Sequence, residues 1–119
     1  MVKIIDCPRD AIQGLKTFIP TEKKIEYLNL LLQTGFYAID FGSFVSHKSI
    51  PQLADTSEVV DALDMSNTHT KLLAIIANYR GAVDACNHEN ITYLDILFLF
   101  LRLFRREIHI NLFMILLIV

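Results

Sequence analysis

Residues 2–13, VKIIDCPRDAIQ, set the pattern from which the rest of the chain is interpreted. Residues 2–6 predict a buried parallel strand, because both of its faces would be apolar. Pro8 has a fixed φ and no amide hydrogen, so we expect the strand to end there. Arg9 and Asp10 would lie at its carboxyl end, where an Asp suits a divalent cation and an Arg suits a carboxylate or an oxyanion. A simple ion pair in a loop is the alternative interpretation of these two residues.

The composition indicates one domain of ordinary size without a strong electrostatic bias. The chain has 119 residues and a net charge of −2, which gives no electrostatic case for nucleic-acid binding. Cys7 and Cys86 show neither CxxC nor zinc-site spacing, so we interpret them as free thiols of a reducing compartment. No signal peptide is visible at the first residues, and we expect a cytoplasmic location.

Strand and helix patterns alternate along residues 2–94. After the first strand we expect a helix over 22–33 with Thr21 as its N-cap, a strand over 36–41 that ends at Gly42 and Ser43, a helix over 57–63, a strand over 71–77, a helix over 79–87 and a strand from residue 91. The alternation predicts an α/β fold of parallel βαβ units. Four such strands fit about half of a (β/α)8 barrel or a small open sheet.

Polar side chains follow the predicted strands. Arg9 and Asp10 come after the first strand, Asp40 and Ser43 lie around the end of the second, and Asn78 follows the third. In a barrel the carboxyl ends of the strands converge on one face, where active sites lie. The sequence therefore predicts a candidate site at that face.

Several motifs, taken in order, resemble the N-terminal part of the hydroxymethylglutaryl-CoA lyases, within a wider superfamily of metal-dependent TIM-barrel lyases and synthases. The motifs are CPRDAIQG (7–14), FIPTEKKIEYL (18–28), IDFGSFVSHKSIPQLADTSEV (39–59) and KLLAIIANYRGAVDAC (71–86). The resemblance covers residues 1–94. It implies that this part of the chain forms the first half, approximately, of a truncated TIM barrel.

The resemblance implies roles for five residues. Arg9 would stabilise the enolate that forms as a carbon–carbon bond of the substrate breaks, and Asp10 would bind a divalent metal ion, Mg²⁺ or Mn²⁺. Gln13, Asp40 and Ser43 would line the substrate-binding site, with Asp40 at a position where many relatives carry Glu. The family's His-x-His metal ligands, a further Asn ligand and the catalytic cysteine of a Gly-rich loop have no counterpart in this sequence.

The activity implied by the resemblance is cleavage of 3-hydroxy-3-methylglutaryl-CoA to acetyl-CoA and acetoacetate, a step of leucine degradation. The implied partners are an acyl-CoA substrate and, for the intact family, a second copy in a homodimer. Because the other ligands and the catalytic cysteine are missing, we expect this form of the chain to be inactive. A fragment of a related acyl-CoA-dependent synthase, which would share the Arg-Asp-x-x-Gln opening, is an alternative.

Residues 95–119, DILFLFLRLFRREIHINLFMILLIV, depart from the family pattern. Charged side chains divide this apolar run, which disfavours a membrane helix. With suitable codons, one nucleotide restored before residue 95 gives GYSFSISETFQKRNTHK, which resembles the family's continuation. We therefore predict a boundary after residue 94 and a frameshifted tail. A small non-catalytic protein that uses the tail as a membrane or interaction segment is the alternative.

Overall fold

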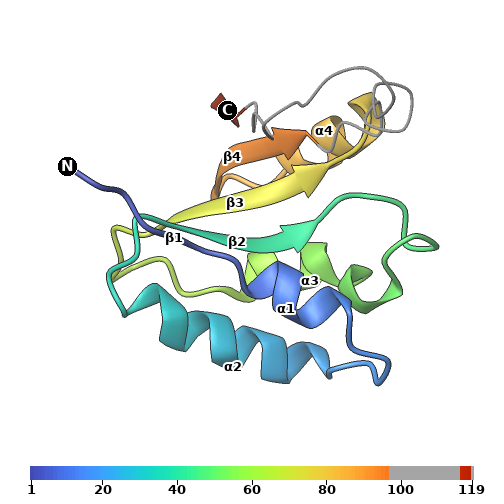
Figure 1. The fold of residues 1–119 in the computed structure, drawn as a ribbon, viewed down its shortest axis with the longest axis horizontal. Coiled ribbons are helices and arrows are strands. Elements are labelled where there is room, and N and C mark those ends of the chain that lie inside the picture. The colour runs from blue at the N-terminus through green and yellow to red at the C-terminus, as the bar shows by residue number, and fades with distance from the viewer. Residues whose placement is uncertain (97–115, 119) are drawn as a thin grey trace, which may run out of the picture.

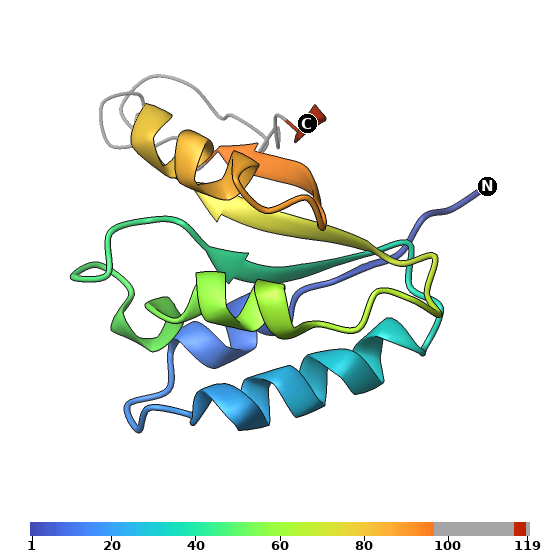
Figure 2. The ribbon, with the colours of Figure 1, turned by 180° about the vertical axis from the view of Figure 1, so that it is seen from behind.

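The computed structural model describes residues 1–96 and 116–118, which form one sheet with helices packed against it (Figure 1; Figure 2 gives the opposite view). The elements in chain order are β1 (Ile5–Asp6), α1 (Pro8–Gln13), α2 (Thr21–Leu32), β2 (Ala38–Ser43), the short 3-10 helix η1 (Pro51–Leu53), α3 (Thr56–Ala62), β3 (Lys71–Ile76), α4 (Tyr79–Cys86), β4 (Ile91–Ile96) and β5 (Leu116–Ile118).

The strands follow one another across the sheet in chain order, β1-β2-β3-β4-β5. The first four are parallel, which confirms the predicted α/β fold of βαβ units. A doubly wound open sheet reverses its strand order at a switch point, whereas a barrel does not. The order of β1 to β4 therefore favours the barrel over the open sheet.

The first strand is shorter than expected. β1 contains Ile5 and Asp6 alone, while the side chains of Val2 and Ile4 are 87% and 61% exposed. The prediction of a buried strand over residues 2–6 is therefore wrong. Among the described residues β1 pairs only with β2, so the residues before it have no second strand to pack beside. The predicted end of the strand at Pro8 is confirmed, because Pro8 begins α1.

Most other elements lie within two residues of their predicted positions. α2 begins at Thr21 itself, with Pro20 as the N-cap, and the Thr21 hydroxyl donates to Asp55 instead of capping the helix. α2 ends at Leu32, one residue before the predicted end, and Gly35 just beyond it takes a φ of 86° that favours glycine. Asn78 caps α4, where its side chain accepts a hydrogen bond from the Gly81 amide at 2.9 Å.

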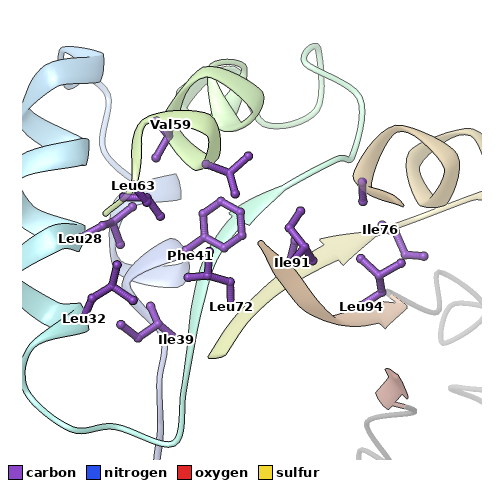
Figure 3. Close-up of a cluster of buried hydrophobic side chains, with 13 residues drawn as sticks. Leu28, Leu32, Ile39, Phe41, Val59, Leu63, Leu72, Ile76, Ile91 and Leu94 are labelled. Atoms are coloured by element: carbon purple, nitrogen blue, oxygen red, sulfur yellow. The ribbon is translucent and has the colours of Figure 1, made fainter. Parts of the chain in front are cut away.

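The main core lies between the sheet and the helices (Figure 3). β2 contributes Ile39 and Phe41 to it, and α2 contributes Leu28 and Leu32. The remaining buried members are Val59, Val60, Leu63, Leu72, Ala74, Ile76, Ala85, Ile91 and Leu94. Side chains alternate between the two faces of a strand, so Asp40, between Ile39 and Phe41, leaves this core for the opposite face.

The sheet continues beyond the four parallel strands. β5 pairs antiparallel with β4, with Leu117 opposite Leu94. β4 runs on to Ile96 and so includes residues on both sides of the predicted boundary. Residues 97–115 and 119, on which most of the predicted frameshifted tail falls, lie outside the described residues. No helix of residues 1–96 is long and apolar enough to cross a membrane.

Candidate functional site

The candidate site lies where β1 ends and α1 begins. Pro8 occupies the first turn of α1, where its missing amide hydrogen costs no helical hydrogen bond. Arg9 and Asp10 follow it in that same turn, and Gln13 lies one turn further along. β2 pairs in parallel beside β1 and carries Asp40.

Arg9 and Asp40 form a charge-assisted pair across the two strands. Arg9 Nε donates to Asp40 Oδ1 and Oδ2 at 3.2 and 3.1 Å, and Arg9 Nη2 donates to Oδ2 at 2.5 Å. The side chains of Arg9 and Asp40 are only 13% and 6% exposed. A two-pronged contact of this kind fixes the plane of the guanidinium as well as its position.

The third nitrogen of the guanidinium is held by α1 itself. Arg9 Nη1 donates to Gln13 Oε1 at 3.1 Å and lies 3.5 Å from Asp10 Oδ1. Residues four apart are neighbours on a helix, which explains how Gln13 reaches Arg9. The structure thus brings Arg9, Asp10, Gln13 and Asp40 together, and the Arg9–Asp10 loop pair proposed as the simpler interpretation is the weaker of the two ionic contacts.

The electrostatics of the pair are set by burial and by hydrogen bonding. Burial raises the pKa of Asp40 above the usual range of a carboxyl group, and the hydrogen bond and positive charge of Arg9 offset only part of that rise. Burial lowers the pKa of Arg9, but the bond and the charge of Asp40 raise it by more, so its pKa stays above the ordinary value. Arg9 is therefore a fixed cation at the site.

Two residues near this pair were not among the predicted site residues. Asp95, near the carboxyl end of β4, has a pKa raised by burial and lowered in part by the charge of Arg9. Desolvation and then the charge of Asp40 raise the pKa of the Cys7 thiol. Asp95 had been assigned to the predicted tail, and Cys7 had been interpreted only through its spacing to Cys86. Neither the predicted boundary after residue 94 nor the spacing of the two cysteines indicates which strand ends lie close together in the fold.

Ser43 and Asn78 are used by the backbone near them. The Ser43 side chain is buried and its Oγ accepts the Val45 amide at 3.1 Å. The Ser43 amide in turn donates to Thr56 Oγ1 at 3.1 Å. No hydrogen bond or ion pair between described residues connects Ser43 to Arg9 or Asp40. Asn78 is the N-cap of α4. Of the polar residues predicted at the strand ends, Arg9, Asp10 and Asp40 therefore come together, whereas Ser43 and Asn78 bond to the backbone near them.

A resident metal ion does not fit the described residues. Asp10, the predicted ligand, has a side chain that is 71% exposed and lies beside the positive charge of Arg9. No group of three or more His, Cys, Asp or Glu side chains within residues 1–96 could hold a metal ion. A single exposed carboxylate is a poor site for Mg²⁺ or Mn²⁺, which take several oxygen ligands.

The PQLAD motif, residues 51–55, has a structural role in this fold. Asp55 accepts hydrogen bonds from Lys24 Nζ at 2.7 Å and from Thr21 Oγ1 at 2.8 Å, which fastens α2 to the start of α3. Gln52 Nε2 donates to the carbonyl oxygens of Leu15 and Thr17, and its Oε1 accepts the Ile19 amide. The motif therefore holds the loop between α1 and α2.

An open cavity of about 710 Å³ lies between the loop after β2 and α4. Its lining includes His47 and Lys48 from the loop and Arg80, Asp84 and His88 from the helix and the residues that follow it. His88 pairs with Asp61 at 2.7 Å, whereas Lys48 and Arg80 form no ion pair with another described residue. The cavity thus presents two cations that are available to an anionic ligand.

Comparison with known proteins gives consistent partial matches, although no family model matches the chain. The cytoplasmic 3-hydroxy-3-methylglutaryl-CoA lyase of Rattus norvegicus is 46% identical over 63 residues, which are 52% of this chain and 18% of that protein. The cytoplasmic lyase of Danio rerio is 44% identical over 91 residues, 74% of this chain and 27% of that protein. The mitochondrial hydroxymethylglutaryl-CoA lyase of Arabidopsis thaliana is 42% identical over 81 residues, which are 67% of this chain and 17% of that protein.

Solved structures agree with these relatives. The HMG-CoA lyase of Acinetobacter baumannii, solved with coenzyme A and 3-methylmalate, has a TM-score of 0.74 and 34% identity over 81% of this chain and 31% of its own. The HMG-CoA lyase of Bacillus subtilis has a TM-score of 0.74 and 31% identity over 80% and 32%. The chain therefore spans 17–27% of the length of these curated relatives and about a third of these solved chains.

Proposed function

Curated relatives and solved structures agree on the 3-hydroxy-3-methylglutaryl-CoA lyase family, and with that family as the premise we propose that the Arg9–Asp40 cluster is this chain's share of a lyase active site. The reaction would be cleavage of 3-hydroxy-3-methylglutaryl-CoA to acetyl-CoA and acetoacetate. The observation that supports the proposal is the guanidinium of Arg9, which Asp40 and Gln13 hold in one orientation beside the carboxyl ends of β1 and β2.

The chemistry explains why a held guanidinium is needed. A base removes the proton of the tertiary hydroxyl, whose oxygen becomes the carbonyl oxygen of acetoacetate as the adjacent carbon–carbon bond breaks. The electron pair of that bond passes to the thioester carbonyl and gives an enolate, which takes up a proton at carbon to form acetyl-CoA. Arg9 would donate hydrogen bonds to the enolate oxygen, and a pre-oriented donor is most effective where the charge develops.

Asp40 and Gln13 act through Arg9 in this proposal and are positioning residues. Asp40 keeps the guanidinium in plane through Nε and Nη2, and Gln13 holds Nη1. Asp10 would contact Mg²⁺ or Mn²⁺ only where further ligands are supplied by a longer chain. Ser43 is proposed as a substrate-binding residue through its position at the end of β2.

The acyl-CoA would place its phosphates in the cavity beside α4. Lys48 and Arg80 supply two cations there, and phosphate groups bind well to such side chains. In keeping with the family, we also propose a role in leucine degradation, a cytoplasmic location and a homodimer for an intact chain. The relatives include both cytoplasmic and mitochondrial lyases.

The first test is an assay of acetoacetate release from 3-hydroxy-3-methylglutaryl-CoA with the purified chain. We expect no turnover, since the family's His-x-His metal ligands, its Asn ligand and its catalytic cysteine have no counterpart in this sequence. Turnover near that of an intact lyase, lost in Arg9→Ala, would contradict the inactivity.

A second test asks whether the cluster works in a complete enzyme. Residues 1–94 are joined to the remaining part of the Danio rerio lyase, and kcat is measured with and without Arg9→Ala. Loss of an oxyanion donor lowers kcat about 10²–10³-fold. The control is Lys23→Ala, an exposed cation of α2 whose removal leaves kcat unchanged. An active fusion in which Arg9→Ala has no effect would refute the proposed role.

A further inference from the structure

A second cluster of ionisable side chains lies near the amino ends of the strands, whereas the Arg9–Asp40 cluster lies toward their carboxyl ends. Lys3 belongs to the segment before β1, Tyr37 directly precedes β2, Lys71 is the first residue of β3, and Tyr93 lies in β4. Four separate parts of the chain therefore meet here, and the proposed lyase chemistry uses none of them. Figure 1 shows the N-terminal segment leading into this edge.

The hydrogen bonds of the cluster centre on one phenol oxygen. Tyr37 Oη lies 2.5 Å from Tyr93 Oη, 3.3 Å from Lys3 Nζ and 3.4 Å from Lys71 Nζ. Lys71 Nζ also donates to Tyr93 Oη at 3.3 Å. A lysine ammonium group can only donate hydrogen bonds, and a phenol can donate one. All three groups around Tyr37 Oη are therefore able to donate a hydrogen bond to it.

The rings add to the attraction. The rings of Tyr37 and Tyr93 are stacked with centroids 6.2 Å apart, and Lys3 Nζ and Lys71 Nζ lie 4.4 and 4.7 Å from the centroid of Tyr37. Cations at such distances are attracted to the face of an aromatic ring. No carboxylate among the described residues forms an ion pair with Lys3 or Lys71, so the phenols are their partners here.

We propose that Lys3, Tyr37, Lys71 and Tyr93 form one proton-sharing unit that fastens the N-terminal segment to the sheet and holds it more firmly after one phenol proton has left. With the proton gone, the two oxygens share the remaining phenol hydrogen. The negative charge on Tyr37 Oη then faces two ammonium groups, one of which belongs to the N-terminal segment. The Tyr37 amide already donates to the Ile4 carbonyl at 3.0 Å, which holds the backbone of the N-terminal segment. The contact of Lys3 with Tyr37 Oη adds a side-chain attachment to it.

The titration expected for Tyr37 agrees with this geometry. The hydrogen bond of Tyr93, followed by those of Lys3 and Lys71, lowers the pKa of Tyr37 from 10.0 to about 8. Hydrogen bonds of Tyr93 and Tyr37 raise the pKa of Lys71. An acidic group whose pKa is lower in the folded than in the unfolded chain adds to the stability of the folded chain as the pH rises from the folded pKa toward the unfolded pKa. The segment is therefore held more tightly between about pH 8 and 10, a window taken from the shift of Tyr37.

The test is an NMR pH titration of the full chain labelled at the ring carbon that bears the hydroxyl of tyrosine. The chain has four tyrosines, so four signals are expected. We expect one of them, absent in Tyr37→Phe, to titrate near pH 8. In Tyr93→Phe, which keeps the ring and removes the hydroxyl, the Tyr37 signal should move toward the ordinary value of about 10. The matched control is Tyr79→Phe, since Tyr79 is 85% exposed on α4.

A second measurement follows the segment itself. The order parameter of the Ile4 methyl groups should increase as pH rises through 8 in the wild-type chain and stay constant in Lys3→Met and Tyr37→Phe. Four tyrosines that titrate together near 10, a Tyr37 signal unmoved by Tyr93→Phe, or an Ile4 response that persists in Lys3→Met would each overturn the proposal.

Discussion

Lys24 Nζ lies 2.7 Å from Asp55 Oδ1, and both side chains are buried, at 3% and 8% exposure. The ammonium group also donates to the Gln52 carbonyl oxygen, and its third side faces the ring of Phe18 at 4.0 Å. The pair joins α2 to the start of α3 across the loop that follows α1. The contact thus ties α2 to η1 and to the residue that precedes α3.

Asp55→Ala should destabilise the chain by about 3–5 kcal/mol, because it leaves the ammonium group of Lys24 buried without its counter-ion. The free energy of unfolding is measured by urea titration followed by circular dichroism. The control is Lys23→Ala, which removes a pair with Glu26 at a similar distance, 2.8 Å, but at 69% and 62% exposure. Exposed pairs contribute about 0.2–1 kcal/mol. Equal losses in the two variants would contradict the structural role of Asp55.

Gly42→Ala should destabilise the chain by about 1–3 kcal/mol through overpacking. A Cβ at residue 42 would lie 2.6 Å from Thr56 Cγ2 and 3.1 Å from Thr56 Oγ1. The unfolding free energy of the double variant Gly42→Ala, Thr56→Ser should recover part of the loss, since serine lacks the methyl group and keeps the hydroxyl that bonds the Ser43 amide. Gly14→Ala is the control, because no atom lies within 4 Å of its added Cβ. A loss in Gly42→Ala that Thr56→Ser does not relieve would assign the effect to the backbone.

Arg9→Met should raise the pKa of Asp40 further. Burial, the larger influence, remains in this variant, while the hydrogen bonds and the charge of Arg9 are lost. A carboxyl group whose folded pKa is raised binds its proton more tightly in the folded state, so this group adds stability as pH falls from the folded pKa toward the unfolded value. The pKa is measured from the carboxyl carbon of Asp40 by NMR, and the slope of stability against pH near the folded pKa should steepen. An unchanged pKa would show that Arg9 does not contact Asp40 in solution.

Asn78→Ala should cost about 1 kcal/mol of unfolding free energy, the usual loss of an N-cap side chain. The Asn78 oxygen accepts the Gly81 amide at 2.9 Å and satisfies one of the free donors of α4. Asn87→Ala at the other end of the helix is the control, because there the backbone amide and not the side chain makes the capping contacts. Similar losses for both variants would argue against a specific cap.

A DNA sequence tests the predicted frameshift. The region after codon 119 should contain an open frame, offset by one base, that encodes a His-x-His pair and a Gly-rich loop with a cysteine. An unrelated gene with no such motif in any frame would instead leave the tail to be explained by its own function. Asp95, whose carboxylate senses the charge of Arg9, is the first residue that a restored frame would replace.

Local pattern was sufficient for most elements, because helical spacing marks the buried face of a helix and a continuous apolar run marks a strand that is buried on both faces. Residues 79–87 were predicted as a helix and form α4 at Tyr79–Cys86, and residues 71–77 were predicted as a strand and form β3 at Lys71–Ile76. The prediction of a buried strand was wrong for residues 2–4. Their apolar side chains fit a buried strand, but burial requires neighbours on both sides, and sequence does not show where a sheet edge lies.

The candidate site could be predicted only where one motif contains it. Arg9, Asp10 and Gln13 belong to one motif, although the six-residue helix α1 that brings them together was not predicted. The partners Asp40 for Arg9 and Asp55 for Lys24 each lie 31 residues away in the chain, so only the fold brings them together.

The raised pKa of Cys7 has a consequence for oxidation. The thiolate is the form of cysteine that attacks peroxides and disulfides, so a thiol that keeps its proton reacts slowly. Cys7 is free and exposed, next in sequence to Pro8 and two residues before Arg9, where a bulky mixed disulfide would crowd the guanidinium. Partial burial, followed by the charge of Asp40, raises the pKa of the thiol and so favours its protonated form. The carboxylate that orients Arg9 therefore also disfavours the reactive thiolate form of Cys7.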